Sequence, residues 1–103
     1  MKTVESIIQE NKNVCYLCGR SQRESGQHLD KHHVFGAALR SKSEQYGATV
    51  YLCHGTCHIF GENSVHKNAG VNNRLKAEAQ KVLMDRHGWT VEDFRKEFYK
   101  NYL

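Results

Sequence analysis

Proline is absent from the 103-residue chain, so no proline-rich linker divides it, and the length suits one small domain over 1–103. No apolar run approaches the roughly 18 residues that a membrane span needs, so no membrane partner is expected. The first 14 residues mix polar and apolar side chains and do not resemble a signal peptide, which makes the cytoplasm the expected compartment. A hydrophobic content of 39% and a charged content of 25% argue against a disordered chain.

Acidic residues are fewer than basic ones. The chain has 11 Asp and Glu against 15 Lys and Arg, which gives a net charge of +4 with neutral histidines. A mild basic excess fits contact with nucleic acid, and it fits a solubilising surface equally well. Charge alone therefore leaves both interpretations open.

Four cysteines form two close pairs, which is the most informative pattern in so short a chain. Cys15 and Cys18 lie in CYLCGR, and Cys53 and Cys57 lie in CHGTC. Two short-spaced pairs at this separation are typical of a structural four-cysteine zinc site, and Gly19 suits the tight turn after the first pair. The alternative, two disulfides or a redox pair, requires an oxidising compartment that no targeting segment supports.

The first half of the chain predicts a helix, a loop and two strands. The helix spans residues 1–14, with Thr3 as its cap and apolar residues on one side. The polar stretch 21–27 reads as a loop. Strands are expected within 29–36 and 48–53, because both contain β-branched or aromatic residues.

Further caps predict three more helices. Ser41 followed by Glu44 is a capping-box pattern, which predicts a short helix ending near Gly47. Ser64 is a candidate cap, and apolar residues at helical spacing predict a helix over 73–87. Gly88 is expected to end that helix. Thr90 and Asp93 are expected to cap a terminal helix, whose apolar side carries Phe94, Phe98 and Tyr102. Trp89 is expected to pack between the two helices.

The histidines hold the candidate chemistry. His32 and His33 are neighbours on a predicted strand, so their side chains point to opposite sides and are expected to have different roles at one site. One would bind a metal while the other meets water or substrate. His58 directly follows Cys57, and His66 comes eight residues later. An imidazole set of this kind suits a divalent ion that activates phosphate chemistry. His28 and His54 are expected to be exposed or to support a ligand.

The order C-x-x-C, D-x-H-H-V, L-C-x-x-x-C-H resembles the HNH endonuclease superfamily, also called ββα-metal or His-Me finger nucleases. The resemblance spans about half the chain, from Cys15 to about His66. The strings HHVFG, YGATVYLC and VHKN, with the tail GWTVEDFRKEFYKNYL, are similar to small HNH-like proteins of phages and prophages. The implied fold is α+β, with a treble-clef-like ββα-metal core over 15–72 stapled by zinc. An N-terminal helix over 1–14 and C-terminal helices over 73–103 flank it.

The resemblance also implies a role for each histidine. His33 matches the general base, and His32 and His58 match ligands of the catalytic metal. His66 matches a third ligand, with Glu62 or Asn63 as alternatives. The implied ion is a single Mg²⁺ or Mn²⁺, which Zn²⁺ or Ni²⁺ replaces in some crystals, and the implied cut in DNA leaves a 3′ hydroxyl.

One departure from the family concerns its middle asparagine. Ala48 occupies that position, beside Thr49. Either Thr49 or Gln45 substitutes for the asparagine, or the active site is weakened.

Basic residues that flank the motifs are the candidate phosphate contacts, although a solvated surface role is the alternative for each. Arg40 is the strongest candidate, because it is expected in the loop between the two strands. A homodimer or a larger phage DNA-processing partner is compatible with so small a nuclease, in a bacterial host cytoplasm. The full set is Lys31, Arg40, Lys42, Lys67 and Arg74.

Three functions follow. The first is a metal-dependent DNA endonuclease, and the second is a zinc-stabilised DNA-binding module of the same fold without catalysis. The third is a small protein-interaction domain. The full histidine set favours the first, because a purely structural protein needs only the four cysteines.

Overall fold

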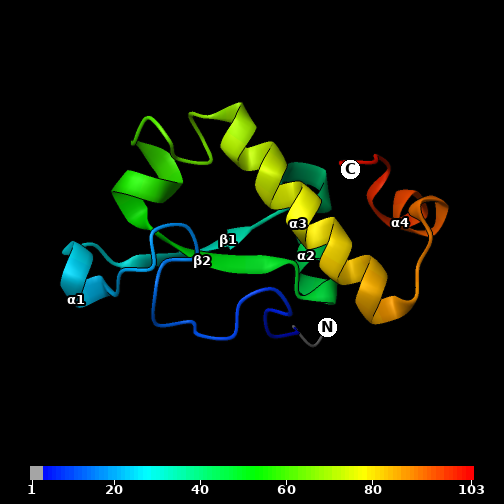
Figure 1. Cartoon of the computed structure of the whole chain (residues 1–103), viewed down its shortest axis with the longest axis horizontal. Coiled ribbons are helices and arrows are strands. Elements are labelled where there is room, and N and C mark those ends of the chain that lie inside the picture. The colour runs from blue at the N-terminus through cyan, green and yellow to red at the C-terminus, as the bar shows by residue number, and fades with distance from the viewer. Residues whose placement is uncertain (1–3) are drawn as a thin grey trace.

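A two-stranded antiparallel sheet and several helices make up the α+β fold of this protein (Figure 1). The computed structural model describes residues 4–103. In chain order the elements are α1 (Gln22–Ser25), β1 (Leu29–His33), η1 (Ala37–Leu39), α2 (Arg40–Tyr46), β2 (Thr49–Cys53), η2 (His54–Ile59), α3 (Ala69–His87) and α4 (Val91–Phe98). Of the two short η elements, η1 is a 3₁₀ turn and η2 is a π-helical segment.

Both predicted strands are present. Leu29 pairs with Cys53 at one end of the sheet and His33 pairs with Thr49 at the other. All of β2 except Tyr51 is buried, while β1 has no fully buried residue. The sheet thus presents the histidine-bearing strand toward the surface and anchors the other strand in the core.

The helix predicted over 1–14 is wrong for its described part. Thr3 lies outside the described residues, and residues 4–14 form no helix. The Ser6 hydroxyl instead accepts hydrogen bonds from the backbone N–H groups of Ile8 and Gln9, and Ile7 N–H donates to the Gly47 carbonyl at 3.0 Å. The segment runs alongside β2 (Figure 1). A helix this short is marginal in water, so contacts with the rest of the fold decide its conformation.

The stretch predicted as a loop over 21–27 contains the short helix α1. Ser21 and Glu24 form a reciprocal capping box, and Gly26 ends the helix in the left-handed region. The loop prediction rested on polar composition and overlooked this pair.

The capping box predicted for α2 is absent although the helix is present. The helix begins at Arg40, and Leu39 before it makes no side-chain cap. The Glu44 carboxylate turns instead toward Lys31 and His33. Gly47 ends the helix in the left-handed region as predicted, at a place where a Cβ would collide with a backbone carbonyl oxygen.

α3 begins four residues earlier than predicted, so the boundary expected between 72 and 73 falls inside it. Asn68 caps it by accepting the Val71 N–H at 3.1 Å, and Ser64 is not its cap. Gly88 ends the helix in the left-handed region, as predicted. The first turn of α3, residues 69–72, includes Gly70 and only one large apolar side chain, Val71, so a search for apolar periodicity does not find it.

α4 has the predicted capping box of Thr90 and Asp93. Tyr99 adopts a left-handed conformation and ends the helix, so Tyr102 lies beyond it. The Tyr102 ring still packs 5.4 Å from Phe35. Trp89 is half-buried and contacts Tyr46 of α2 and His87 at the end of α3. The buried core joins β2, α3 and α4 through Val50, Leu52, Leu75, Ala79, Leu83, Phe94 and Phe98, together with Val34 and Phe35.

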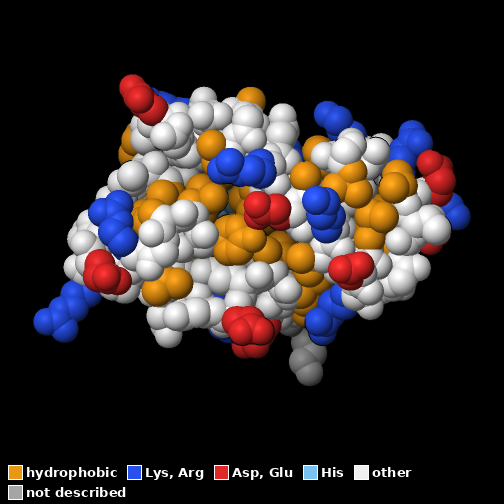
Figure 2. All heavy atoms as spheres, in the orientation of Figure 1, with side chains coloured by type: hydrophobic (Ala, Val, Ile, Leu, Met, Phe, Trp, Pro, Cys, Tyr) orange, Lys and Arg blue, Asp and Glu red, His pale blue; other side chains and the backbone are white. Residues whose placement is uncertain are grey.

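The surface carries both signs of charge. On the face drawn in Figure 2, basic and acidic side chains alternate around exposed apolar ones, and no single sign dominates. Within residues 4–103, none of the helices combines the length and apolar character of a membrane span.

Candidate metal centres

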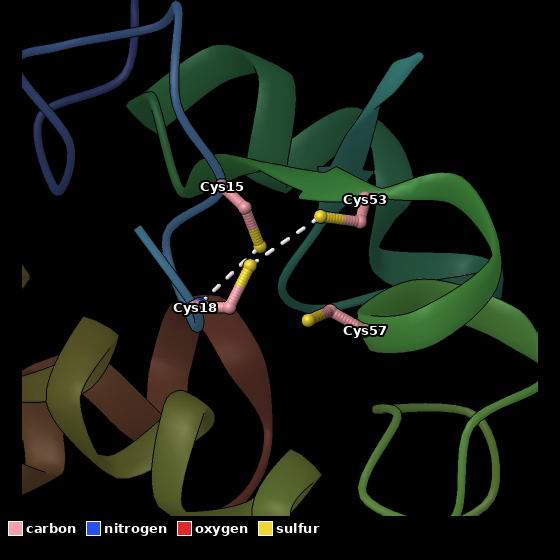
Figure 3. Close-up of side chains that lie close together, drawn as sticks. All are labelled: Cys15, Cys18, Cys53 and Cys57. Atoms are coloured by element: carbon pink, nitrogen blue, oxygen red, sulfur yellow. Dashed lines mark hydrogen bonds between the residues drawn. The ribbon is translucent and has the colours of Figure 1, made fainter. Parts of the chain in front are cut away.

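Four cysteine side chains converge from two turns, and their sulfurs point toward one another (Figure 3). The ligand atoms of Cys15, Cys18, Cys53 and Cys57 all lie within 4.8 Å of one another. The first pair lies in a turn in which Gly19 N–H donates to the Cys15 carbonyl at 2.8 Å and Gly19 has φ of 76°. Cys53 ends β2, and Cys57 belongs to η2.

The spacing of these sulfurs fits a metal ion better than disulfides. Cys18 Sγ lies 3.4 Å from Cys53 Sγ, well beyond a disulfide bond of about 2.05 Å. A tetrahedral ion with Zn–S bonds of about 2.3 Å would place its sulfurs about 3.8 Å apart. The four free cysteines are therefore compatible with a metal site.

The pKa values of the clustered cysteines are compatible with a bound cation. Burial raises the pKa of Cys18, but hydrogen bonds from Arg20, together with those from Cys53 and Cys15, outweigh it and bring this pKa to about 6. Burial raises the pKa of Cys53 to about 11 and also raises that of Cys57. Sulfurs this close ionise together only when a bound cation compensates their charge.

A second cluster joins three of the predicted histidines. His32 lies near the end of β1, His58 lies in η2, and His66 follows in the loop before α3. Their ligand atoms lie within 4.8 Å of one another, and His58 Nε2 is 3.3 Å from His66 Nε2. The structure thus gathers the three residues that the resemblance assigned to one ion.

The nitrogen atoms of this cluster are short of partners. His32 Nε2 is buried and has no hydrogen-bond partner, an arrangement that costs about 1–3 kcal/mol. Burial and the neighbouring His58 and His66 lower the pKa of His32 to about 3, so its ring is neutral at physiological pH. A bound cation would satisfy this nitrogen, and the residues therefore fit a metal ion.

Asp30 sets the orientation of His58. Its Oδ2 lies 2.8 Å from His58 Nδ1. Burial raises the pKa of Asp30, but the hydrogen bonds from His58 and His54 outweigh it and lower the pKa overall. Since Nδ1–H donates to this carboxylate, Nε2 of His58 keeps its lone pair toward His32 and His66.

His33 points away from that cluster along the strand and meets a different carboxylate. Its Nε2 lies 2.6 Å from Oε1 of Glu44, and its side chain is 14% exposed. Glu44 also lies 3.0 Å from Lys31 Nζ. The hydrogen bonds from Lys31 and His33 together outweigh burial and lower the pKa of Glu44, which keeps the carboxylate ionised beside the imidazole.

One cleft is lined both by His33 and by the three histidines of the cluster. The hollow measures about 260 Å³. Both adjacent histidines therefore reach one space from opposite sides of the strand. The lining consists of Lys31, His32, His33, Gly36, Ala37, Arg40, His58 and His66.

Only two of the five basic candidates, Lys31 and Arg40, line this cleft. Lys67 is exposed beside His66 but does not line it. Lys42 is turned away, because its ammonium lies 3.2 Å from Glu97 of α4. Arg74 lies beside the cysteine cluster, in a separate hollow with Cys18. Basic residues close to the histidine motifs in the sequence therefore do not all lie close to the cleft in space.

The structure also places the residues named as alternatives for the third metal ligand and for the family's middle asparagine. Glu62 and Asn63 line the hollow on the cysteine side, away from the three histidines. Thr49 pairs with His33 across the sheet, but its hydroxyl is buried without a partner. Among the described residues, Glu44 is the one that hydrogen-bonds the His33 ring, and neither Thr49 nor Gln45 does so.

Two supporting residues, Asp30 and Glu44, were missed from the sequence. The signal for Asp30 was available, because positions two apart on a strand share a face and Asp30 precedes His32 by two. Glu44 was interpreted as part of a helix cap, which concealed its contact with His33.

No family model, curated protein or solved structure matches this chain.

Proposed function

We propose that this protein is a metal-dependent DNA endonuclease of the HNH type that hydrolyses phosphodiester bonds. The observation that carries the proposal is the shared cleft, in which His33 lies beside three converging imidazoles. A purely structural protein of this size needs only the cysteine cluster. A second cluster with a buried, unpartnered nitrogen points to a further ion.

The cysteine cluster is proposed to hold a structural Zn²⁺ in a treble-clef-like core. Four sulfurs leave no open coordination position, so the ion would support the fold without taking part in the reaction. It would tie the turn at Cys15 and Cys18 to the end of β2, which carries Cys53. The strand pair that presents His32 and His33 would then keep its position relative to η2.

His33 is the proposed general base. Glu44 accepts the Nε2 proton of His33, which leaves Nδ1 with a lone pair for a proton taken from water. The carboxylate also favours the protonated imidazole that this transfer produces. Glu44 is thus a positioning residue that acts through His33.

His32, His58 and His66 are the proposed ligands of one divalent ion, Mg²⁺ or Mn²⁺. When bound there, the ion would supply the positive charge that stabilises the phosphate transition state and the leaving oxygen. Three imidazoles and an open side also accept Zn²⁺ or Ni²⁺, so the metal is best determined by assay. Asp30 would hold His58 in the tautomer that binds a metal.

DNA is the proposed substrate, and Arg40 and Lys31 are the proposed phosphate contacts. Arg40 is exposed at the start of α2 on the edge of the cleft. Its guanidinium suits a phosphate oxygen pair better than a lone ammonium does. Lys31 is held by Glu44, so its contribution to DNA binding would be smaller.

The test is cleavage of supercoiled plasmid with Mg²⁺ or Mn²⁺, comparing the wild type with His33→Ala at equal zinc content. We expect the wild type to nick or linearise the plasmid and His33→Ala to lose about 10²- to 10⁴-fold in rate. His87→Ala is the matched control, because this histidine is exposed at the end of α3. Equal cutting by all three proteins would overturn the assignment of the base.

A second candidate function is a DNA-binding module of the same fold without catalysis. The observation in its favour is Ala48, which is buried where the resembled family has its middle asparagine. Salt-dependent plasmid binding without cleavage, in the wild type and in His33→Ala, would support this function over the first. Absence of both binding and cleavage would favour a protein-interaction domain.

A further inference from the structure

A third group of potential ligands lies beside the three-histidine cluster. The ligand atoms of His28, Asp30 and His54 lie within 4.8 Å of one another. Oδ1 of Asp30 is 3.0 Å from His28 Nε2, and Oδ2 is 2.7 Å from His54 Nδ1. Both imidazoles therefore use the same carboxylate from two sides.

The backbone builds this group into the end of the sheet. His54 N–H donates to the His28 carbonyl at 3.0 Å, one step beyond the pair of Leu29 and Cys53. The two rings stack with their centroids 4.6 Å apart. His28 directly precedes β1 and Asp30 lies on β1 two residues later, so both side chains share a face where the paired backbone continues to His28.

The start of η2 is also held in place. The side-chain oxygen of Gln27 accepts the N–H groups of Gly55 and Thr56 at 2.8 and 3.0 Å. His54 is thereby fixed next to Asp30 of β1 and next to His28, which directly precedes that strand. The group is not an accidental meeting of mobile surface side chains, because Asp30 lies in the paired strand β1 and a backbone hydrogen bond joins His28 to His54.

We infer that His28, Asp30 and His54 form a second histidine–carboxylate metal site, which binds a borderline transition-metal cation such as Zn²⁺. Two imidazoles and one carboxylate are a ligand set of Zn²⁺ sites. In a tetrahedral site with bonds of about 2.0 Å, neighbouring ligand atoms lie about 3.3 Å apart. The imidazole nitrogens of His28 and His54 lie 3.0 and 2.7 Å from the Asp30 oxygens, so each would move a few tenths of an ångström outward to admit the ion. The His28 side chain is 62% exposed, which leaves an entry path for the ion.

Asp30 makes this site a neighbour of the proposed catalytic one. The same Oδ2 atom lies 2.7 Å from His54 Nδ1 and 2.8 Å from His58 Nδ1. An ion bound by His28 and His54 would share the carboxylate that orients His58. The site is distinct from the proposed nuclease site in its own ligands, and its existence does not depend on nuclease activity.

The experiment is a titration with Co²⁺ of the full-length protein loaded with a single equivalent of zinc, followed by its visible absorption and by native mass spectrometry. Retention of one zinc ion in the mass spectrum shows that the cysteines are not exchanged. The variants are His28→Ala, which removes a ligand of the new site alone, and His66→Ala, which removes a ligand of the other cluster alone. His87→Ala is the control for loss of an exposed histidine.

We expect the wild type and His87→Ala to bind two Co²⁺ ions beyond the zinc, and His28→Ala and His66→Ala to bind one each. If His28→Ala binds as many ions as the wild type, the new site does not exist. If the wild type binds one ion that is lost in His28→Ala and kept in His66→Ala, the new site stands and the proposed catalytic metal fails. If that single ion is lost in His66→Ala alone, the new site fails and the catalytic one stands.

A second measurement protects against a variant that fails to fold. In the wild type, NMR spectra of the histidine side chains with added Zn²⁺ should show shifts of the His28 and His54 ring signals at about one equivalent beyond those that move His32, His58 and His66. Unchanged signals of His28 and His54 would overturn the inference without any substitution.

Discussion

The cysteine cluster and the three-histidine cluster are both candidate metal centres, but they are built in opposite ways. Cys15 and Cys53 are almost completely buried and lie at the ends of backbone turns or strands. His66 is exposed and borders an open cleft of about 260 Å³. Four sulfurs close a tetrahedral site, whereas three nitrogens leave a position free. The closed cysteine cluster is thus suited to stabilising the fold, whereas the open three-histidine cluster is suited to binding a substrate at its metal ion.

The largest expected contrast is in stability. Cys15→Ser should remove more than about 4 kcal/mol from the free energy of unfolding, because it takes a buried ligand from the closed centre. His66→Ala should leave the fold almost unchanged, because its ring is exposed in a loop. Urea unfolding of the zinc-loaded proteins measures both. Equal stability of the two variants would contradict the contrast between the centres.

The next effect concerns the carboxylate behind the open centre. Asp30→Asn keeps the size of the side chain but removes the charge that holds His58 Nδ1–H. We expect affinity for Mn²⁺ at the three-histidine cluster to fall about 10- to 100-fold. Isothermal titration calorimetry measures the change, and Asp85→Asn on the exposed surface of α3 is the matched control. Unchanged affinity would show that Asp30 does not orient the ligand.

The smallest expected effect is on the cleavage rate and concerns Glu44, which positions the proposed general base His33. Glu44→Gln retains a hydrogen-bond acceptor near His33 but loses the charge that favours the protonated ring. We expect the rate of plasmid cleavage to fall about tenfold, with metal affinity unchanged. Comparison of the cleavage rate with the metal titration separates this role from that of Asp30. A loss of metal binding in Glu44→Gln would instead place Glu44 with the ligands.

The parts of the fold that depend on local chemistry could be predicted from the sequence. β-branched residues in 48–53, the glycines at 47 and 88, and the Thr90–Asp93 cap each act within a few residues, and the structure has them. The two cysteine pairs could likewise be recognised by spacing, and their sulfurs meet. The role of the zinc and of the histidines stays a prediction.

Features that depend on distant partners could not be predicted in the same way. Residues 4–14 have the pattern of a helix, but Ser6 and Ile7 bond to the segment around Gly47. Lys42 looks like a phosphate contact until Glu97 of α4 is placed beside it. Glu44 has the spacing of a helix cap, and its true partner lies on a strand. In each case a tertiary contact outweighs a local preference.

The contact between Cys18 and Cys53 has a topological consequence. A metal ion held there would close a loop that contains both His32 and His33. A permanent cross-link enclosing a loop of this length restricts the unfolded chain by about 4 kcal/mol in the chain-entropy treatment. When α3 or α4 detaches transiently, this loop would remain closed and β1 would stay tethered to β2. Unlike a disulfide, a metal cross-link is lost when the ion dissociates. The concentration of free metal ion would therefore determine how large a fraction of the molecules keeps His32 and His33 in position.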